Sequence, residues 1–204
     1  MSSSNFLSNL RASLIADASV VINLNATARA AEIIKAVQIP FIATENACTE
    51  LEAGVRNGHG DYARLLELID AGHIRRARLG ATGMPVYESL IDGSTARTLD
   101  DGEAATIAYA QETGGVALID ERKARSLCAK SFPGLVVACT AELLMHDAVA
   151  AVLGTQGQAD ALANALSGAR MRVPAEHLAK VRIMIGPERA ALCGSLPRAM
   201  REPV

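Results

Sequence analysis

Short apolar runs alternate along the chain with longer stretches in which apolar residues recur every three or four positions. The short runs predict buried strands at residues 12–17, 38–43, 115–120 and 134–139, and the alternating run at 73–79 predicts a half-buried strand. Strands that alternate with helices require right-handed crossovers and form a mostly parallel sheet with helices on both faces. We therefore expect an α/β fold, arranged as a three-layer α/β/α sandwich.

Helical periodicity and helix-end signals place the helices between these strands. Thr44 is suited to cap one helix, Gly72 to end another, and Pro174 to open the last. The expected helices span residues 27–37, 44–58, 61–72, 98–115, 121–130, 140–152, 159–170 and 175–186. Residues 81–96 fit either a short helix or a loop. The helical pattern after residue 155 predicts a helical C-terminal extension.

The composition indicates a single core that needs neither a disulfide nor a structural metal. Half of the 204 residues are apolar and 21% are charged, which suffices for one sizeable core. No apolar run reaches the roughly 20 residues that a membrane span needs. Because no secretory signal is visible either, we expect a cytoplasmic protein that does not enter the membrane.

Charge and aromatic content alone argue against a nucleic-acid-binding protein. The net charge is −2, and three Phe, three Tyr and no Trp offer little surface for base stacking. The balance along the chain is uneven, however. Residues 160–204 carry seven Lys and Arg against four Asp and Glu, a net of +3, which leaves −5 for the rest. An acidic body of this kind suits a metal site.

The Cys and His residues show no pattern typical of a catalytic or zinc site. The four Cys are scattered, without a C-x-x-C pair or a His at zinc-ligand spacing, and are most simply reduced, buried residues. The four His have no shared ligand spacing and no nucleophile partner. A Walker-type phosphate loop is also absent from the sequence.

Acidic residues stand where predicted strands end or predicted helices begin. Asp17 and Asp120 each end a strand, so both carboxylates reach the carboxyl edge of a parallel sheet, where such folds bind ligands. If Glu50 and Glu103 reach the same edge, the four carboxylates repel one another and raise one another's pKa values. A bound cation resolves that conflict, and oxygen ligands without His or Cys favour Mg²⁺ or Mn²⁺.

Each acid also fits a purely structural role when considered alone. Asp17 is a favoured N-cap for the helix that follows it. Asp100 and Glu103 are spaced as a capping box, and Glu50 fits the solvated side of a helix. Only the convergence of all four acids at one edge favours the metal site over these roles.

Basic residues follow Asp120 directly and are candidates for contact with a substrate phosphate. Arg122, Lys123 and Arg125 either line the same crevice or form a solvated helix face. Ser19, next to Asp17 in the sequence, is a further candidate for a phosphate contact.

Four segments resemble the PIN-domain family, in the group close to the VapC-type ribonuclease toxins. They are ADAS with Asp17, TELE with Glu50, LDDGEAATIAYA with Glu103 and ALIDERKAR with Asp120. The resemblance spans roughly residues 12–150, and SGARMRVPAEHLAKV resembles the tail of one branch. It implies a parallel sheet flanked by helices, a Mg²⁺- or Mn²⁺-dependent endoribonuclease site, frequent homodimers and often a small antitoxin protein encoded next door.

Carried onto this chain, the resemblance implies catalytic metal ligands, directly or through water, at Asp17, Glu50, Glu103 and Asp120. Glu121 is a less certain neighbour, because the strand end can shift by one residue. Many relatives carry Asp where Glu103 stands, so Asp101 is a substitute candidate. The near-isosteric changes Asp17→Asn and Asp120→Asn are expected to abolish cleavage and preserve the fold.

We therefore predict an endoribonuclease, a metal-dependent hydrolase of RNA phosphodiester bonds and the toxin of a type II toxin–antitoxin pair. Residues 1–11 are expected to be flexible, 12–184 to form the PIN-like nuclease domain, and 185–204 to be an extension with an extra helix, a dimer contact or an antitoxin-binding surface. The alternatives are a non-catalytic PIN-like module that binds RNA or protein, and a metal phosphatase that acts on a small molecule.

Overall fold

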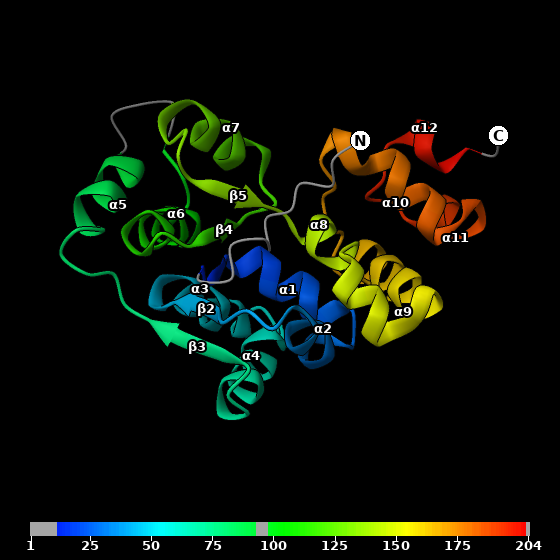
Figure 1. The fold of residues 1–204 in the computed structure, drawn as a ribbon, viewed down its shortest axis with the longest axis horizontal. Coiled ribbons are helices and arrows are strands. Elements are labelled where there is room, and N and C mark those ends of the chain that lie inside the picture. The colour runs from blue at the N-terminus through cyan, green and yellow to red at the C-terminus, as the bar shows by residue number, and fades with distance from the viewer. Residues whose placement is uncertain (1–11, 93–97, 203–204) are drawn as a thin grey trace.

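The computed structural model describes residues 12–92 and 98–202, and its centre is a sheet of five parallel strands (Figure 1). The strands are β1 (Leu14–Ala16), β2 (Phe41–Thr44), β3 (Ile74–Ala77), β4 (Val116–Leu118) and β5 (Val136–Ala138). Helices lie on both sides of this sheet, so the predicted three-layer α/β/α class with a helical C-terminal part is confirmed. The segment expected to be flexible, residues 1–11, lies outside the described residues.

Helices connect the strands and continue the chain after β5. They are α1 (Ala18–Ala26), α2 (Ala30–Val37), α3 (Glu45–Val55), α4 (Asp61–Asp70), α5 (Met84–Ile91), α6 (Asp101–Thr113), α7 (Arg122–Ser131), α8 (Thr140–Leu144), α9 (Asp147–Gly168), η1 (Ala175–His177), α10 (Leu178–Ile185), α11 (Pro187–Leu192) and α12 (Arg198–Arg201). The undecided segment 81–96 therefore contains a helix, α5. Pro174 opens the short 3₁₀ helix η1, and α10 follows it.

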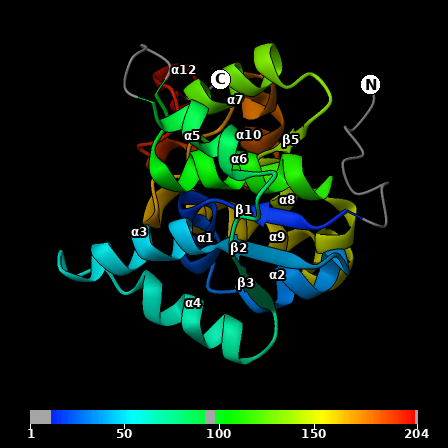
Figure 2. The same ribbon diagram turned by 90° about the vertical axis from the view of Figure 1, so that its left-hand side faces the viewer.

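Side chains of the central strands alternate between two cores. On β1, Leu14 and Ala16 belong to one core, and Ile15 belongs to the other. The first core is completed mainly by α1, α2, α4 and α9, and the second by α5, α6 and α7, on the opposite face of the sheet (Figure 2). Every residue of β1 is fully buried, as expected for a central parallel strand covered on both faces.

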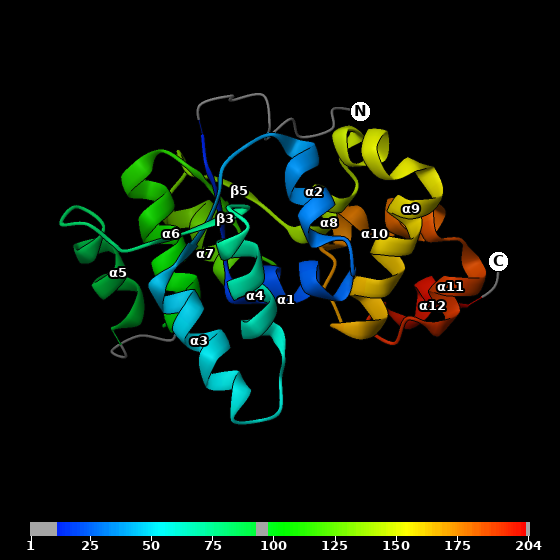
Figure 3. The ribbon, with the colours of Figure 1, turned by 90° about the horizontal axis from the view of Figure 1, so that it is seen from below.

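The long helix α9 packs along α1 and α2 (Figure 3) and bends at Gly154, whose φ of 72° and ψ of 165° are not helical. The C-terminal helices α10 and α11 pack against α9. Ala190, Cys193 and Leu196 are buried in the first core. The segment beyond residue 185 is thus packed on the body of the protein. None of the helices in the described ranges is long and apolar enough to cross a membrane.

The strand order β3-β2-β1-β4-β5 reverses direction between β1 and β4. The chain moves outward from β1 through β2 to β3, and then returns to β4 on the other side of β1. Connections that leave neighbouring strands in opposite directions open a crevice at the carboxyl ends of those strands. Asp17 directly follows β1, and Asp120 follows β4 by two residues. The topology therefore brings these two acids to the same crevice.

Gly115, just before β4, provides a test of the packing between β1 and β4. A Cβ atom at this position would lie 2.9 Å from Ile15 Cδ1 and 3.0 Å from the Ser13 carbonyl oxygen. We expect Gly115→Ala to lower the free energy of unfolding by about 1–3 kcal/mol, because backbone atoms cannot easily move aside. Urea denaturation measures the change. Gly134→Ala, where a Cβ would meet nothing within 4 Å, is the matched control and should stay within about 0.5 kcal/mol of the wild type.

Candidate active site

A pocket of about 290 Å³ lies at the carboxyl ends of β1 and β4. The candidates from the sequence that line it are Asp17, Ser19, Glu50, Glu103, Asp120 and Glu121. Asp100, which we considered only as a helix cap, adds another carboxylate. The structure thus brings the acids from four distant segments into one pocket.

Each of the four central acids is positioned by a different element. Asp17 is the N-cap of α1, Glu50 lies in the middle of α3, Glu103 lies in the first turn of α6, and Asp120 lies between β4 and α7. Because α3 packs against α6, their two glutamates face a common space. Asp17, Glu103 and Asp120 are 3%, 7% and 6% exposed, whereas Glu50 stands at the exposed rim.

The two carboxylate oxygens of Asp17 differ in their hydrogen bonding. Oδ2 accepts hydrogen bonds from the Ser19 hydroxyl at 2.7 Å and from the Ser19 backbone N–H at 3.3 Å. Oδ1 is buried and has no hydrogen-bond partner. A buried carboxylate oxygen without a partner is costly, so it points to a ligand that the pocket is built to hold. The helix-cap role of Asp17 is therefore compatible with its place in the pocket.

Gly102 makes room for two of the carboxylates. A Cβ atom on Gly102 would lie 2.5 Å from Glu50 Oε2 and 3.0 Å from Asp17 Oδ1. Both oxygen atoms therefore approach the space that the missing side chain leaves free at the start of α6. The sequence alone did not single out this residue, since its role depends on contacts across the fold.

Asp120 is held by three hydrogen bonds. Its Oδ1 accepts from the Thr140 backbone N–H at 2.7 Å. Its Oδ2 accepts from the Thr140 hydroxyl at 2.6 Å and from the Asn23 side-chain amide at 2.6 Å. These donors fix the orientation of the carboxylate. Sequence reasoning missed Asn23 and Thr140, which lie 97 and 20 residues away from Asp120 along the chain.

Burial and mutual repulsion raise the pKa values of all four acids. Desolvation is the largest cause, followed by the charges of Asp17 and Asp100, and together they raise the pKa values of Glu50 and Glu103 to about 7 each. The pKa values of Asp17 and Asp120 are also raised, mainly by burial, although hydrogen bonds to Ser19 and Thr140 oppose the shift. Without a cation, the pocket therefore holds protons near neutral pH.

The carboxylates surround the pocket but do not form a tight cage. Among the residues that the structure describes, no three of these acids bring their oxygen atoms within 4.8 Å of one another. An ion in this pocket would therefore contact some of the acids only through water.

Two neighbouring acids differ from their sequence-based roles. The carboxylate of Asp101 accepts hydrogen bonds from the Tyr87 hydroxyl and from Asn46 Nδ2, and it does not line the pocket. It is therefore not placed to substitute for Glu103. The expected capping box is also incomplete, because the Asp100 side chain makes no capping hydrogen bond.

Two arginines that we did not single out from the sequence supply the positive charge of the pocket. Arg170 and Arg172, just after α9, line it, and Arg172 forms an ion pair with Glu121. Arg170 has a φ of 54°, an uncommon left-handed conformation for a residue with a side chain. Glu121 is also the N-cap of α7. These arginines come from the basic C-terminal portion of the chain.

The predicted phosphate contacts on α7 lie to one side of this pocket. Arg122 and Arg125 line an adjoining pocket of about 870 Å³, which shares Asp120, Glu121 and Arg172 with the first. Arg125 pairs with Glu176 at 3.4 Å. Lys123 donates through Nζ to the carbonyl oxygen of Thr98. The structure therefore places these cations beside the acids and not among them.

The shifted acids predict how stability depends on pH when chelator is present. Glu103 has an ordinary pKa of 4.5 and a folded-state pKa of about 7, so the folded protein binds more protons than the unfolded chain between these values. The free energy of unfolding should therefore fall as the pH rises from about 5 to about 7.5. Glu103→Gln should flatten this dependence and raise stability at pH 8 by at most about 3 kcal/mol.

Urea denaturation in chelator at a series of pH values measures this dependence. Glu67→Gln, at an exposed position on α4, is the matched control and should retain the slope of the wild type. A stability that stays constant or rises over this pH range in the wild type would contradict the arrangement of acids described here.

Comparison with known proteins agrees with this fold. A protein-family model described as a PIN domain matches residues 13–186, which is more than half of the chain. The searches of curated proteins and of solved structures found no match. The matched range contains all five strands and the four central acids of the pocket. The chain therefore belongs to the PIN-domain family.

Proposed function

We propose that this protein is a Mg²⁺- or Mn²⁺-dependent endoribonuclease. PIN domains are generally nucleases that use divalent metals, and this chain has the family's fold. The observation that carries the proposal is the acidic pocket itself, in which a buried oxygen of Asp17 lacks a hydrogen-bond partner. A hard cation stabilises carboxylates that are buried together and repel one another.

The residues present fit a hard divalent ion. Asp17, Glu50 and Glu103 would hold it, directly or through water, and Asp120 would complete the set from its fixed position. A bound Mg²⁺ or Mn²⁺ lowers the pKa of a water molecule and neutralises charge on the phosphate. The space at Gly102 leaves two of the carboxylates free to approach the ion.

The protein's own residues would position the RNA strand. Arg170 and Arg172 would meet the oxygens of the scissile phosphate, because guanidinium groups suit phosphate geometry. Ser19 lines the same pocket, and its hydroxyl would have to turn away from Asp17 Oδ2 to donate a hydrogen bond to the phosphate. Arg122 and Arg125 in the adjoining pocket would contact a neighbouring phosphate of the strand.

We further propose that the protein is the toxin of a type II toxin–antitoxin pair, with a small antitoxin protein and a homodimeric state. The support is the resemblance of the acid motifs to the VapC-type group. Growth arrest on induced expression of the wild type, but not of Asp17→Asn, would support a toxin role, and equal growth in both cultures would oppose it.

The alternative function is that of a non-catalytic module that binds RNA or protein. Such a module would not bind Mg²⁺ or Mn²⁺ tightly in calorimetry.

Asp17→Asn should abolish RNA cleavage and leave the fold intact. The substitution keeps the Oδ2 acceptor for Ser19 and removes a buried charge, so the thermal midpoint should hold or rise. A mixed RNA substrate incubated with Mn²⁺, Mg²⁺ or chelator measures the activity. We expect chelator-sensitive cleavage in the wild type and a loss of at least about 100-fold in the variant. Cleavage at the wild-type rate in Asp17→Asn would exclude this site.

Asp120→Asn is less suitable as a test than Asp17→Asn, because it should also lower the stability of the fold. Both oxygens of Asp120 accept hydrogen bonds from Thr140 or Asn23. An amide in either orientation would therefore direct its own N–H groups at another donor. We expect a loss of about 1–3 kcal/mol in unfolding free energy, measured by urea denaturation. Stability equal to that of the wild type would contradict this hydrogen-bond arrangement.

Gly102→Ala should separate activity from stability. Alanine favours the helix by up to about 1 kcal/mol, whereas its methyl group would displace the Glu50 carboxylate, which lies 2.5 Å away. We expect an unchanged or higher thermal midpoint and cleavage reduced by at least about tenfold. Gly168→Ala, in α9, is the matched control, since its Cβ would meet only Ala26 at 3.5 Å. Undiminished cleavage by Gly102→Ala would count against Glu50 as a ligand.

A further inference from the structure

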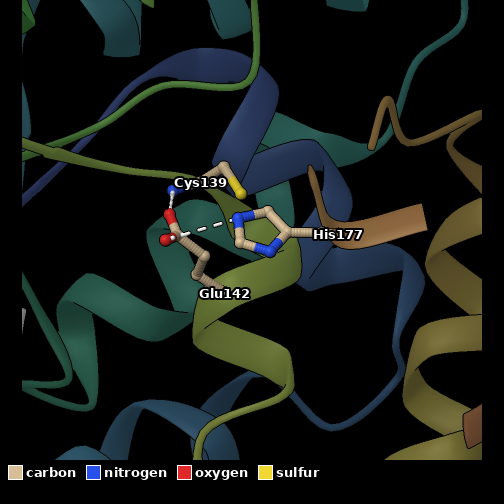
Figure 4. Close-up of side chains that lie close together, drawn as sticks. All are labelled: Cys139, Glu142 and His177. Carbon is tan, nitrogen blue, oxygen red and sulfur yellow. Dashed lines mark hydrogen bonds and ion pairs between the residues drawn. The ribbon is translucent and has the colours of Figure 1, made fainter. Parts of the chain in front are cut away.

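A second group of metal-binding side chains lies outside the acidic pocket. Cys139, Glu142 and His177 each offer one donor atom, and these atoms all lie within 4.8 Å of one another (Figure 4). In the described part of the chain, no other three Cys, His, Asp or Glu residues bring donor atoms this close together. Because 35 residues separate Glu142 from His177 along the chain, their spacing in the sequence did not reveal the group.

The three side chains come from two elements that are distant in the sequence. Cys139 is the N-cap of α8, Glu142 lies within α8, and His177 ends η1. Cys139 is fully buried. The side chains of Glu142 and His177 are 12% and 18% exposed. The group is therefore partly in contact with solvent, through Glu142 and His177.

The distances suit a shared ion better than a direct contact. His177 Nε2 lies 3.4 Å from Glu142 Oε1, beyond the range of about 2.7–3.2 Å typical of a hydrogen bond to oxygen. Ligands about 2.0–2.3 Å from a tetrahedral zinc ion are separated from one another by about 3.5 Å. The other oxygen, Glu142 Oε2, accepts a hydrogen bond from the Cys139 backbone N–H at 2.9 Å, which holds this carboxylate near the sulfur.

The residue at position 139 is itself unusual for its place. Ser, Thr, Asp and Asn are the preferred N-cap residues, because their oxygen accepts hydrogen bonds from the first helical turn. Here a buried thiol takes that place and forms a capping box with Glu142, and the imidazole of His177 lies beside them. A thiolate, an imidazole and a carboxylate together select a borderline ion such as Zn²⁺ over Mg²⁺.

We propose that Cys139, Glu142 and His177 bind a zinc-like transition-metal ion, with water as the fourth ligand. On binding, the Cys139 thiol releases its proton to solvent and its sulfur bonds to the ion. The two anionic ligands then balance the ion's double positive charge. Arg125 lies 4.0 Å from Glu142 and 3.4 Å from Glu176. When Glu142 binds the ion, Arg125 would keep its ion pair with Glu176.

The ion would fasten the C-terminal part of the chain to the catalytic core. His177 leads into α10, whereas Cys139 and Glu142 belong to the body of the fold. Thr140, the residue after Cys139, donates two hydrogen bonds to Asp120. A zinc-like ion at this site would therefore also restrain the donor that orients a carboxylate of the acidic pocket.

Cobalt(II) is a suitable spectroscopic probe for this site. We expect Co²⁺ added to the reduced, metal-free, full-length protein to give a sulfur-to-cobalt charge-transfer band in the near ultraviolet. The band should saturate at one equivalent of Co²⁺ bound to this site, and added Zn²⁺ should abolish it. Cys139→Ser should lack the band and still fold, because Ser is a favoured N-cap. His177→Ala should weaken binding by at least about tenfold. Zn²⁺ at 100-fold its Kd should raise the wild-type thermal midpoint by about 5–11 °C.

Two further variants keep the outcomes distinct. Cys193→Ser removes another buried thiol, 2% exposed, and should retain the band. Asp17→Asn should retain it too, so a failure of the proposed nuclease site does not affect this test. Absence of the band from the reduced wild-type protein, or its persistence in Cys139→Ser, would overturn the proposal.

Discussion

The site depends on the burial of like charges where the sheet reverses its order. Asp17 and Asp120 follow the neighbouring strands β1 and β4, and both are almost fully buried. Their carboxylates cannot move apart, because the register of β1 and β4 fixes the strand ends. The surrounding donors address this conflict only in part. Ser19, Asn23 and Thr140 satisfy three of the four oxygen atoms and leave Asp17 Oδ1 without a partner.

Helix packing completes the site around these two acids. The second core holds α6 against the sheet, and α6 in turn packs on α3. These contacts bring Glu103 and Glu50 to the crevice, where the absence of a side chain at Gly102 leaves room for the carboxylates of Glu50 and Asp17. The basic C-terminal portion then supplies Arg170 and Arg172. An acidic centre with arginines at its edge is suited to a cation and a phosphate together.

The sequence predicted the strands and most of the helices well, because the periodicity of apolar residues indicates which positions are buried. It located all five strands and anticipated that Asp17 and Asp120 would reach one edge. It was less informative where contacts between distant segments decide the outcome. The resemblance to the PIN-domain family made Asp101 a substitute candidate, but its carboxylate accepts hydrogen bonds from Tyr87 and Asn46. Likewise, the cations that line the acidic pocket come from the segment after α9, whereas Arg122 and Arg125 of α7 line the adjoining pocket.

The sequence by itself determined the class of fold, the order of its strands and helices along the chain, and the acid motifs that resemble the PIN-domain family. These properties follow from local periodicity and from short motifs. Only the tertiary structure decided which side chains meet: Asn23 and Thr140 with Asp120, Arg172 with Glu121, and Cys139 and Glu142 with His177. The physical reason is that these contacts depend on strand order and helix packing, which join residues that are far apart in the sequence.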